Sequence, residues 1–146
     1  AKLMHDVEVK VVGGSREEFE KVFGDAGDLK FAEVPYAQVV NELAAADVLL
    51  LTGTGKNEDS NRYTAPMKVF EYLATGKPVV ASRTEALESL IPEALVHYCA
   101  PDDAEALAKA TEAALNDKSG SEARIAYARE HTWRARAQRI ASLFTQ

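Results

Sequence analysis

Residues 64–76 bring together residue types that can bind a phosphorylated, hydroxylated ligand. Pro66 suits the first position of a helix, and Ala65 before it is a poor N-cap residue. The first backbone N–H groups of such a helix lack a side-chain acceptor, and together with the helix dipole they form an anion site. The amides concerned belong to Met67, Lys68 and Val69. An equal alternative is that a preceding hydroxyl, Ser60 or Thr64, caps the helix and that the lysine points to water.

Glu71 follows Lys68 by about one helical turn and precedes Thr75 by another, so the three side chains share one face. Most of the other residues in the segment are apolar, which predicts a largely buried helix in which a carboxylate needs hydrogen-bond partners. Lys68 could be that partner. Two vicinal hydroxyl groups of a ligand could also fill the role. We favour the hydroxyls, because phosphate and hydroxyl sites one turn apart match the spacing within a nucleotide.

Strand-like and helix-like segments alternate along the chain. Predicted strands cover residues 7–12, 29–34, 47–52, 77–82 and 95–99, and predicted helices cover residues 15–23, 36–46, 66–75, 85–90, 103–116, 121–131 and 133–144. This order predicts one α/β domain over residues 1–146 with a doubly wound parallel sheet. Ligands bind beyond the carboxyl ends of the strands in such a sheet. The candidate site therefore comprises the loops at residues 13–14, 32–33, 53–64 and 82–85.

The loop at residues 53–64 is long for a compact α/β domain, which itself indicates function. It opens with a partial phosphate-loop pattern, but Leu50 and Asn57 stand where that motif requires Gly and Ser or Thr. We interpret the segment as a mobile loop at the ligand site, in which Asn57 or Asn61 contacts the ligand.

Composition excludes several classes of function. The net charge of −6 argues against a nucleic-acid partner, and no apolar run reaches the roughly 18 residues of a membrane span. The histidines are far apart and lack metal-ligand spacing, so they are interpreted as structural and no metal is expected.

The single cysteine, Cys99, excludes an internal disulfide and is expected to be a buried small hydrophobe. Trp133 is expected to anchor the last helix in the core. The Arg-rich residues 124–139 are interpreted as a solvated helical surface, with an acidic lipid surface or partner as the alternative.

One long string matches a known family motif, and the elements around it follow in the family's order. The string begins at Ala65, ends at Ser82 and includes Pro66-Met67-Lys68-Val69-Phe70-Glu71-Tyr72-Leu73. The chain thereby resembles the donor-binding domain of retaining glycosyltransferases with two Rossmann-like domains, the GT-B fold (glycosyl transferases group 1). The resemblance covers nearly the whole chain.

The resemblance implies that Glu71 binds the ribose hydroxyls of a nucleoside-diphosphate sugar. It also implies that the helix start holds the diphosphate without a metal or other cofactor, and that the sugar is transferred with retention to a glycan, lipid or small-molecule acceptor in the cytoplasm. The residues at the helix start are Ala65, Pro66, Met67 and Lys68. Beside them we expect Tyr63 and Thr64 on the side of the donor sugar, and Gly13 and Gly14 in a loop near the nucleotide.

Two departures from the family pattern matter. Many members carry a second glutamate eight positions before the ribose-binding one, and here that position is Tyr63. The family's Arg and Lys that neutralise the diphosphate lie upstream, as does the N-terminal acceptor-binding domain. We therefore expect a donor-binding domain truncated at its N-terminus, which alone binds donor weakly and does not catalyse transfer. In the full-length protein, an enzyme, the partners are the donor and the acceptor-binding domain, and peripheral membrane contact is compatible with this function.

Two alternatives stay open. One is a non-catalytic nucleotide- or sugar-binding module of the same fold, with Tyr63 marking a lost carboxylate. The other is an enzyme similar to sugar-nucleotide epimerases, which the string Phe70-Glu71-Tyr72 fits less well.

Overall fold

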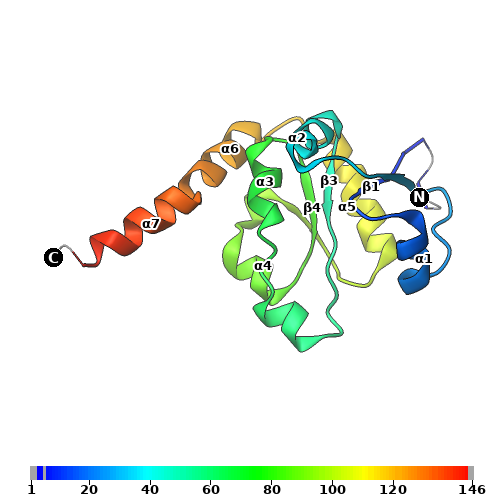
Figure 1. The fold of residues 1–146 in the computed structure, drawn as a ribbon, viewed down its shortest axis with the longest axis horizontal. Helices are drawn as coiled ribbons and strands as arrows, with labels where there is room; N and C mark the ends of the chain where they lie inside the picture. Colours follow the sequence, from blue (N-terminus) through cyan, green and yellow to red (C-terminus); the bar gives the residue numbers. More distant parts are fainter. Residues whose placement is uncertain (1–2, 5, 145–146) are drawn as a thin grey trace. The chain divides into compact units, whose positions relative to one another are not determined.

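The computed structural model describes residues 3–4 and 6–144 and divides the chain into two compact units, Ala1–Ala45 and Ala46–Gln146 (Figure 1). Within the described residues every strand pair is parallel and a helix follows each strand, so the predicted α/β class is confirmed. The strands form a pair in the first unit and a triplet in the second, where the sequence predicted one sheet.

The first unit is a short strand–helix–strand–helix segment. It contains β1 (Lys10–Val12), α1 (Arg16–Phe23), β2 (Lys30–Ala32) and α2 (Tyr36–Ala45). Gly13 and Gly14 turn the chain from β1 into α1 with φ angles of +91° and +80°, in the left-handed region that glycine tolerates best. Ser15 caps α1 and forms a capping box with Glu18.

The second unit holds a parallel sheet in the order β3-β4-β5. Its elements are β3 (Leu49–Leu51), the π-helix η1 (Asp59–Tyr63), α3 (Lys68–Ala74), β4 (Val79–Ser82), α4 (Glu85–Leu90), the 3₁₀ turn η2 (Glu93–Leu95), β5 (His97–Cys99), α5 (Ala104–Asn116), α6 (Ser121–Glu130) and α7 (Trp133–Ser142). Among the described residues no helix is both long and apolar enough to cross a membrane.

Helices cover both faces of this sheet. α5 packs on one face, and α3 and α4 lie on the other (Figure 1). Side chains alternate along a strand, so Val80 and Cys99 point towards α5, where they are buried with Ala114. Val79 and Ala81, which are also buried, face the opposite side. The prediction that Cys99 is a buried small hydrophobe is confirmed.

The packing of α3 against α6 depends on Gly76, which follows α3 with a φ of +73°. A Cβ atom at this position would lie 3.0 Å from Cδ1 of Ile125 and closer still to the hydroxyl oxygen of Ser121. Both the backbone conformation and the space therefore require glycine.

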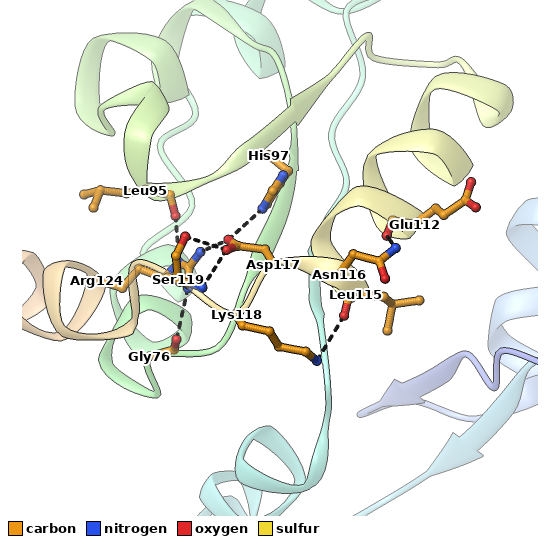
Figure 2. A network of polar contacts seen from close by, with 10 residues as sticks. All are labelled: Gly76, Leu95, His97, Glu112, Leu115, Asn116, Asp117, Lys118, Ser119 and Arg124. Carbon is orange, nitrogen blue, oxygen red and sulfur yellow. Dashed lines mark hydrogen bonds and ion pairs between the residues drawn. The ribbon is translucent and has the colours of Figure 1, made fainter.

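Arg124 of α6 lies in the interior, with a relative exposure of 2%. The interpretation of residues 124–139 as a solvated surface is therefore wrong for this residue. Its guanidinium reaches acceptors on three separate segments, which compensates for the loss of water around the charge (Figure 2). They are the carbonyl oxygens of Gly76 (3.2 Å), Leu95 (3.2 Å) and Ser119 (2.9 Å) and the carboxylate of Asp117 (2.5 Å).

Asp117, the residue after α5, is the anionic centre of the same network (Figure 2). Its carboxylate accepts hydrogen bonds from the hydroxyl (2.7 Å) and the amide (2.8 Å) of Ser119, and it also contacts Nε2 of His97 at 3.1 Å. Hydrogen bonds from Ser119, and then from His97 and Arg124, hold the pKa of the Asp117 carboxyl well below its ordinary value of 3.8. The structural role predicted for His97 agrees with this contact.

The observed elements differ from the predicted ones mainly in length. Every strand is shorter than predicted, because only part of each predicted segment pairs with a neighbouring strand. The helix at Glu85–Leu90 is as predicted. The expected irregular loop at residues 53–64 contains the π-helix η1.

The last helix, α7, exposes its apolar residues. Trp133 is 73% exposed, so the prediction that it anchors the helix in the core is wrong. The reason is visible in Figure 1, where α7 extends beyond α6 and away from the sheet of its own unit. The guanidinium of Arg136 lies 5.5 Å from the Trp133 ring and 5.3 Å from the ring of Phe70. Ile140, Leu143 and Phe144 are exposed as well.

Candidate functional site

The carboxyl ends of β3, β4 and β5 meet at one edge of the second unit, the edge at which open parallel sheets bind ligands. A hollow of about 280 Å³ lies there. It is bounded by residues at or just after the carboxyl ends of the three strands, among them Thr52, Ser82 and Asp102, and by the first turn of α5. The predicted site loops at residues 53–64 and 82–85 belong to this edge.

The loop from Gly53 to Thr64, called here the β3–α3 loop, is held at its base by the end of β4 and by the segment that follows β5. The amide of Gly53 donates to Oγ of the buried Ser82 at 3.0 Å. The hydroxyl of Thr54 and the amide of Gly55 both donate to one carboxylate oxygen of Asp102, at 2.9 and 3.0 Å. These two hydrogen bonds, the one from Thr54 first, lower the pKa of the Asp102 carboxyl.

Asp102 adopts a left-handed conformation, with φ of +59°. Aspartate tolerates this region better than most side chains, but glycine is the residue that adopts it without a steric cost. Gly55, on the loop side of this contact, is closely packed as well, because a Cβ atom there would lie 3.1 Å from Cγ of Pro101. The loop base and the segment after β5 are therefore in close contact.

The far end of the same loop is fastened to Glu85, the first residue of α4. Asn61 and Glu85 exchange two hydrogen bonds of 3.3 Å, one from the Asn61 amide group to the carboxylate and one from the Glu85 backbone N–H to the Asn61 carbonyl. Arg62 donates to the other oxygen of Glu85 at 3.1 Å and to Glu58 at 2.9 Å. Asn57 accepts the amide of Ser60, so both asparagines predicted to contact a ligand make bonds inside the protein.

The helix α3 starts two residues later than predicted, at Lys68, with Met67 as its N-cap residue. No side chain caps it, so neither Ser60 nor Thr64 fills that role. The amide of Val69, predicted to be free, donates to the carbonyl oxygen of Pro66 at 3.1 Å. The amides of Met67 and Lys68 have no acceptor among the described residues, which leaves two of the three predicted donors.

Lys68 and Glu71 lie on the exposed side of α3, while Val69, Phe70 and Leu73 are buried. The prediction of a largely buried helix is therefore wrong for the face that carries the charged residues. Within the described part of the chain neither the ammonium group nor the carboxylate forms a hydrogen bond or an ion pair, and Lys68 is not the partner of Glu71. Both side chains are thus accessible to a ligand.

The remaining predicted residues lie beside this helix start, with two exceptions. Tyr63 is 72% exposed and Met67 39% exposed, and Ala65 is exposed too. Pro66 is half-buried, and the hydroxyl of Thr64 donates to the carbonyl oxygen of Asp59 at 3.0 Å. Gly13 and Gly14 belong to the first unit, so the arrangement described here is that of the second unit alone.

Sequence reasoning assigned no role to the residues that hold the loop, Asp102, Glu85 and Arg62, although the last two fall within the predicted site loops at residues 82–85 and 53–64. Their partners are distant in sequence, with Asp102 lying 48 positions from Thr54 and Glu85 23 positions from Arg62. One signal was available for Asp102. It follows Pro101 at the end of a predicted strand, where a turn is expected and where a polar side chain commonly bonds to nearby backbone. In the described residues no group of three or more His, Cys, Asp or Glu side chains is placed to hold a metal ion.

Comparison with known proteins places this arrangement in a class. Residues 1–142 match the protein family described as Glycosyl transferase-like, and the chain belongs to this family. Its fold is similar to that of sucrose-phosphate synthase from Thermosynechococcus elongatus, with a TM-score of 0.68 and 22% sequence identity over 95% of this chain. That match spans 38% of the synthase chain. No curated protein sequence matches significantly.

Proposed function

We propose that this chain binds the nucleoside-diphosphate part of a sugar donor in a metal-independent, retaining glycosyltransferase. The observation that carries the proposal is the state of Glu71. Its carboxylate is exposed one turn beyond an exposed lysine, Lys68, and it has no partner in the described residues. Both lie on a helix at the carboxyl edge of a parallel sheet, in a chain that belongs to a glycosyltransferase-like family.

The chemistry of these groups suits the two ends of a nucleoside diphosphate. A carboxylate can accept hydrogen bonds from both ribose hydroxyls at once. The ammonium group of Lys68 and the two unbonded amides of Met67 and Lys68 favour a negatively charged diphosphate. During transfer the same donors stabilise the charge that develops on the departing nucleoside diphosphate, which is the main contribution expected of a protein in this reaction.

The complete reaction needs groups that this chain does not supply in the second unit. In this proposal, an acceptor-binding domain binds the acceptor, and residues upstream supply further cations for the diphosphate. The chain alone then binds donor weakly, and the full-length protein carries out the transfer in the cytoplasm.

Tyr63 supports a second candidate, a non-catalytic nucleotide- or sugar-binding module. It stands where many glycosyltransferases carry a carboxylate towards the sugar, and its side chain is 72% exposed. The two candidates share nucleotide binding and differ in transfer. Glycosyl transfer by the full-length protein, abolished by Glu71→Gln, supports the enzyme, whereas nucleotide binding without transfer supports the module.

The binding step is tested by titrating the chain with uridine, guanosine and adenosine diphosphates, followed by calorimetry or by NMR. We expect one of them to bind, and Glu71→Gln to weaken that binding about tenfold, because hydrogen bonds to a charged group are replaced by weaker neutral ones. Glu112→Gln, an exposed glutamate on α5, is the matched control and should bind like the wild type. Equal affinities for wild type and Glu71→Gln would contradict the proposed role, and chelation of divalent metals should leave the affinity unchanged.

A further inference from the structure

The β3–α3 loop leads directly into the proposed nucleotide site. Tyr63 closes η1, and only residues 64–66 separate it from Met67, the N-cap residue of α3. The loop is fixed at both ends. Asp102 holds its base through Thr54 and Gly55, next to the bond from Gly53 to Ser82, and Glu85 holds its far end through Asn61 and Arg62.

We propose that Asp102 is a positioning residue for nucleotide binding. One of its carboxylate oxygens accepts both loop hydrogen bonds and so fixes the base of the loop before the ligand arrives. This inference rests on the proposed nucleotide site at α3. It adds to that site a residue that touches the loop and not the ligand.

The backbone conformation at Asp102 indicates that the aspartate is present for the bonds its side chain makes. With φ of +59°, the position would be adopted most easily by glycine, which carries no Cβ atom. An aspartate is sterically less favourable than glycine at this φ, but it provides the carboxylate that bonds to the loop. Its lowered pKa has the same origin, since the bonds from Thr54 and Gly55 favour the ionised form.

The physical effect of this anchor is pre-organisation. A loop that is ordered only when the ligand binds subtracts its ordering free energy from the affinity, whereas a loop already held does not. Loss of the Asp102 bonds would leave the bond from Gly53 to Ser82 at the first residue of the loop and the solvent-exposed bonds of Glu85 at its far end. The two bonds to Asp102 therefore contribute to the order of residues 54 and 55 in the free protein.

The variant Asp102→Gly removes the side-chain hydrogen bonds without imposing strain on the backbone. Glycine suits the left-handed conformation, and its greater freedom in the unfolded chain opposes that gain, so the melting temperature should change by no more than about 3 °C. The dissociation constant of the best-binding diphosphate among those of uridine, guanosine and adenosine should rise about tenfold, and hydrogen exchange of the Gly55 amide should accelerate. Asp102→Asn keeps an acceptor and tolerates the same φ, so it should restore most of the affinity.

Asp6→Gly is the matched control, because Asp6 has a similar φ of +61° and lies in the first unit. It should leave nucleotide affinity unchanged. Thr54→Val removes one of the two loop donors without altering residue 102 and should weaken binding about threefold. This variant decides the question if Asp102→Gly proves much less stable than expected.

The outcomes separate the two proposals. If the wild type binds one of the diphosphates while Asp102→Gly binds it as tightly, this inference is overturned and the nucleotide site stands. If Asp102→Gly is strongly destabilised and Thr54→Val, with Asp102 intact, binds like the wild type, the same conclusion follows. If the wild type binds none of the three diphosphates, the proposed function fails and takes this inference with it.

Discussion

The guanidinium of Arg124 lies 2.5 Å from the carboxylate of Asp117, and the Arg124 side chain is only 3% exposed. This pair joins the junction of α5 and α6 to two other segments, because Arg124 also bonds to the carbonyl oxygens of Gly76 and Leu95. In the interior such an ion pair is maintained by hydrogen bonds to all of its polar groups. Removal of either charge leaves the other buried and incompletely compensated.

Arg124→Ala should lower the free energy of unfolding by about 3 kcal/mol or more, since it breaks a buried ion pair and leaves three carbonyl oxygens without their donor. Urea denaturation followed by circular dichroism measures the effect. Arg129→Ala, an exposed arginine on the same helix, should change the free energy by less than about 0.5 kcal/mol. Similar losses for the two variants would show that the network contributes little.

Asp117 predicts an acid-sensitive stability. Its pKa is lower in the folded protein than the ordinary value of 3.8, so its contribution is fully present above that value and is lost as the pH falls towards the folded pKa. The urea midpoint of the wild type should therefore fall more steeply between about pH 5 and about pH 2.5 than that of Asp117→Asn. Asp47→Asn, an exposed aspartate in the same unit, should keep the slope of the wild type. Parallel profiles for wild type and Asp117→Asn would contradict this prediction.

Gly76→Ala should destabilise the protein by about 3 kcal/mol, because it combines a disfavoured φ with overlap against Ser121 and Ile125. Gly13→Ala is a control for the backbone term alone. Gly13 has φ of +91°, and a Cβ atom there meets nothing within 4 Å, so the expected cost is about 1 kcal/mol. Thermal unfolding of both variants gives the difference. Equal costs would mean that the contact between α3 and α6 relaxes without penalty.

Local patterns in the sequence predicted most of the fold. The alternation of strands and helices follows from the β-branched runs and from caps such as Ser15 and Thr84, each of which bonds to an amide in the helix that it precedes. The same reasoning failed for Trp133, which was predicted to be buried and is exposed, and for Arg124, which was predicted to be exposed and is buried. A large aromatic is buried only where a packed layer exists to receive it, and an arginine is exposed only where no set of acceptors surrounds it.

The candidate site was predictable in part. The string around Glu71 marks the helix in the sequence itself, but the exposed side of that helix could not be read from residues that are apolar nearly all around. The anchor at Asp102 joins residues 48 positions apart, and no local pattern specifies such a contact. Whether Met67 or Ala65 caps α3 depends on a single turn of backbone, which is the scale at which boundary predictions commonly fail.

The buried thiol of Cys99 gives this protein a built-in reporter. It is the single cysteine of the sequence and lies on β5, packed towards α5, where burial raises the pKa of the thiol. Because Cys99 is only 6% exposed, a thiol reagent should react with it much faster when this layer opens, so the rate of labelling records the opening of the second unit. The kinetics of that opening can be followed in the natural sequence, without an introduced probe.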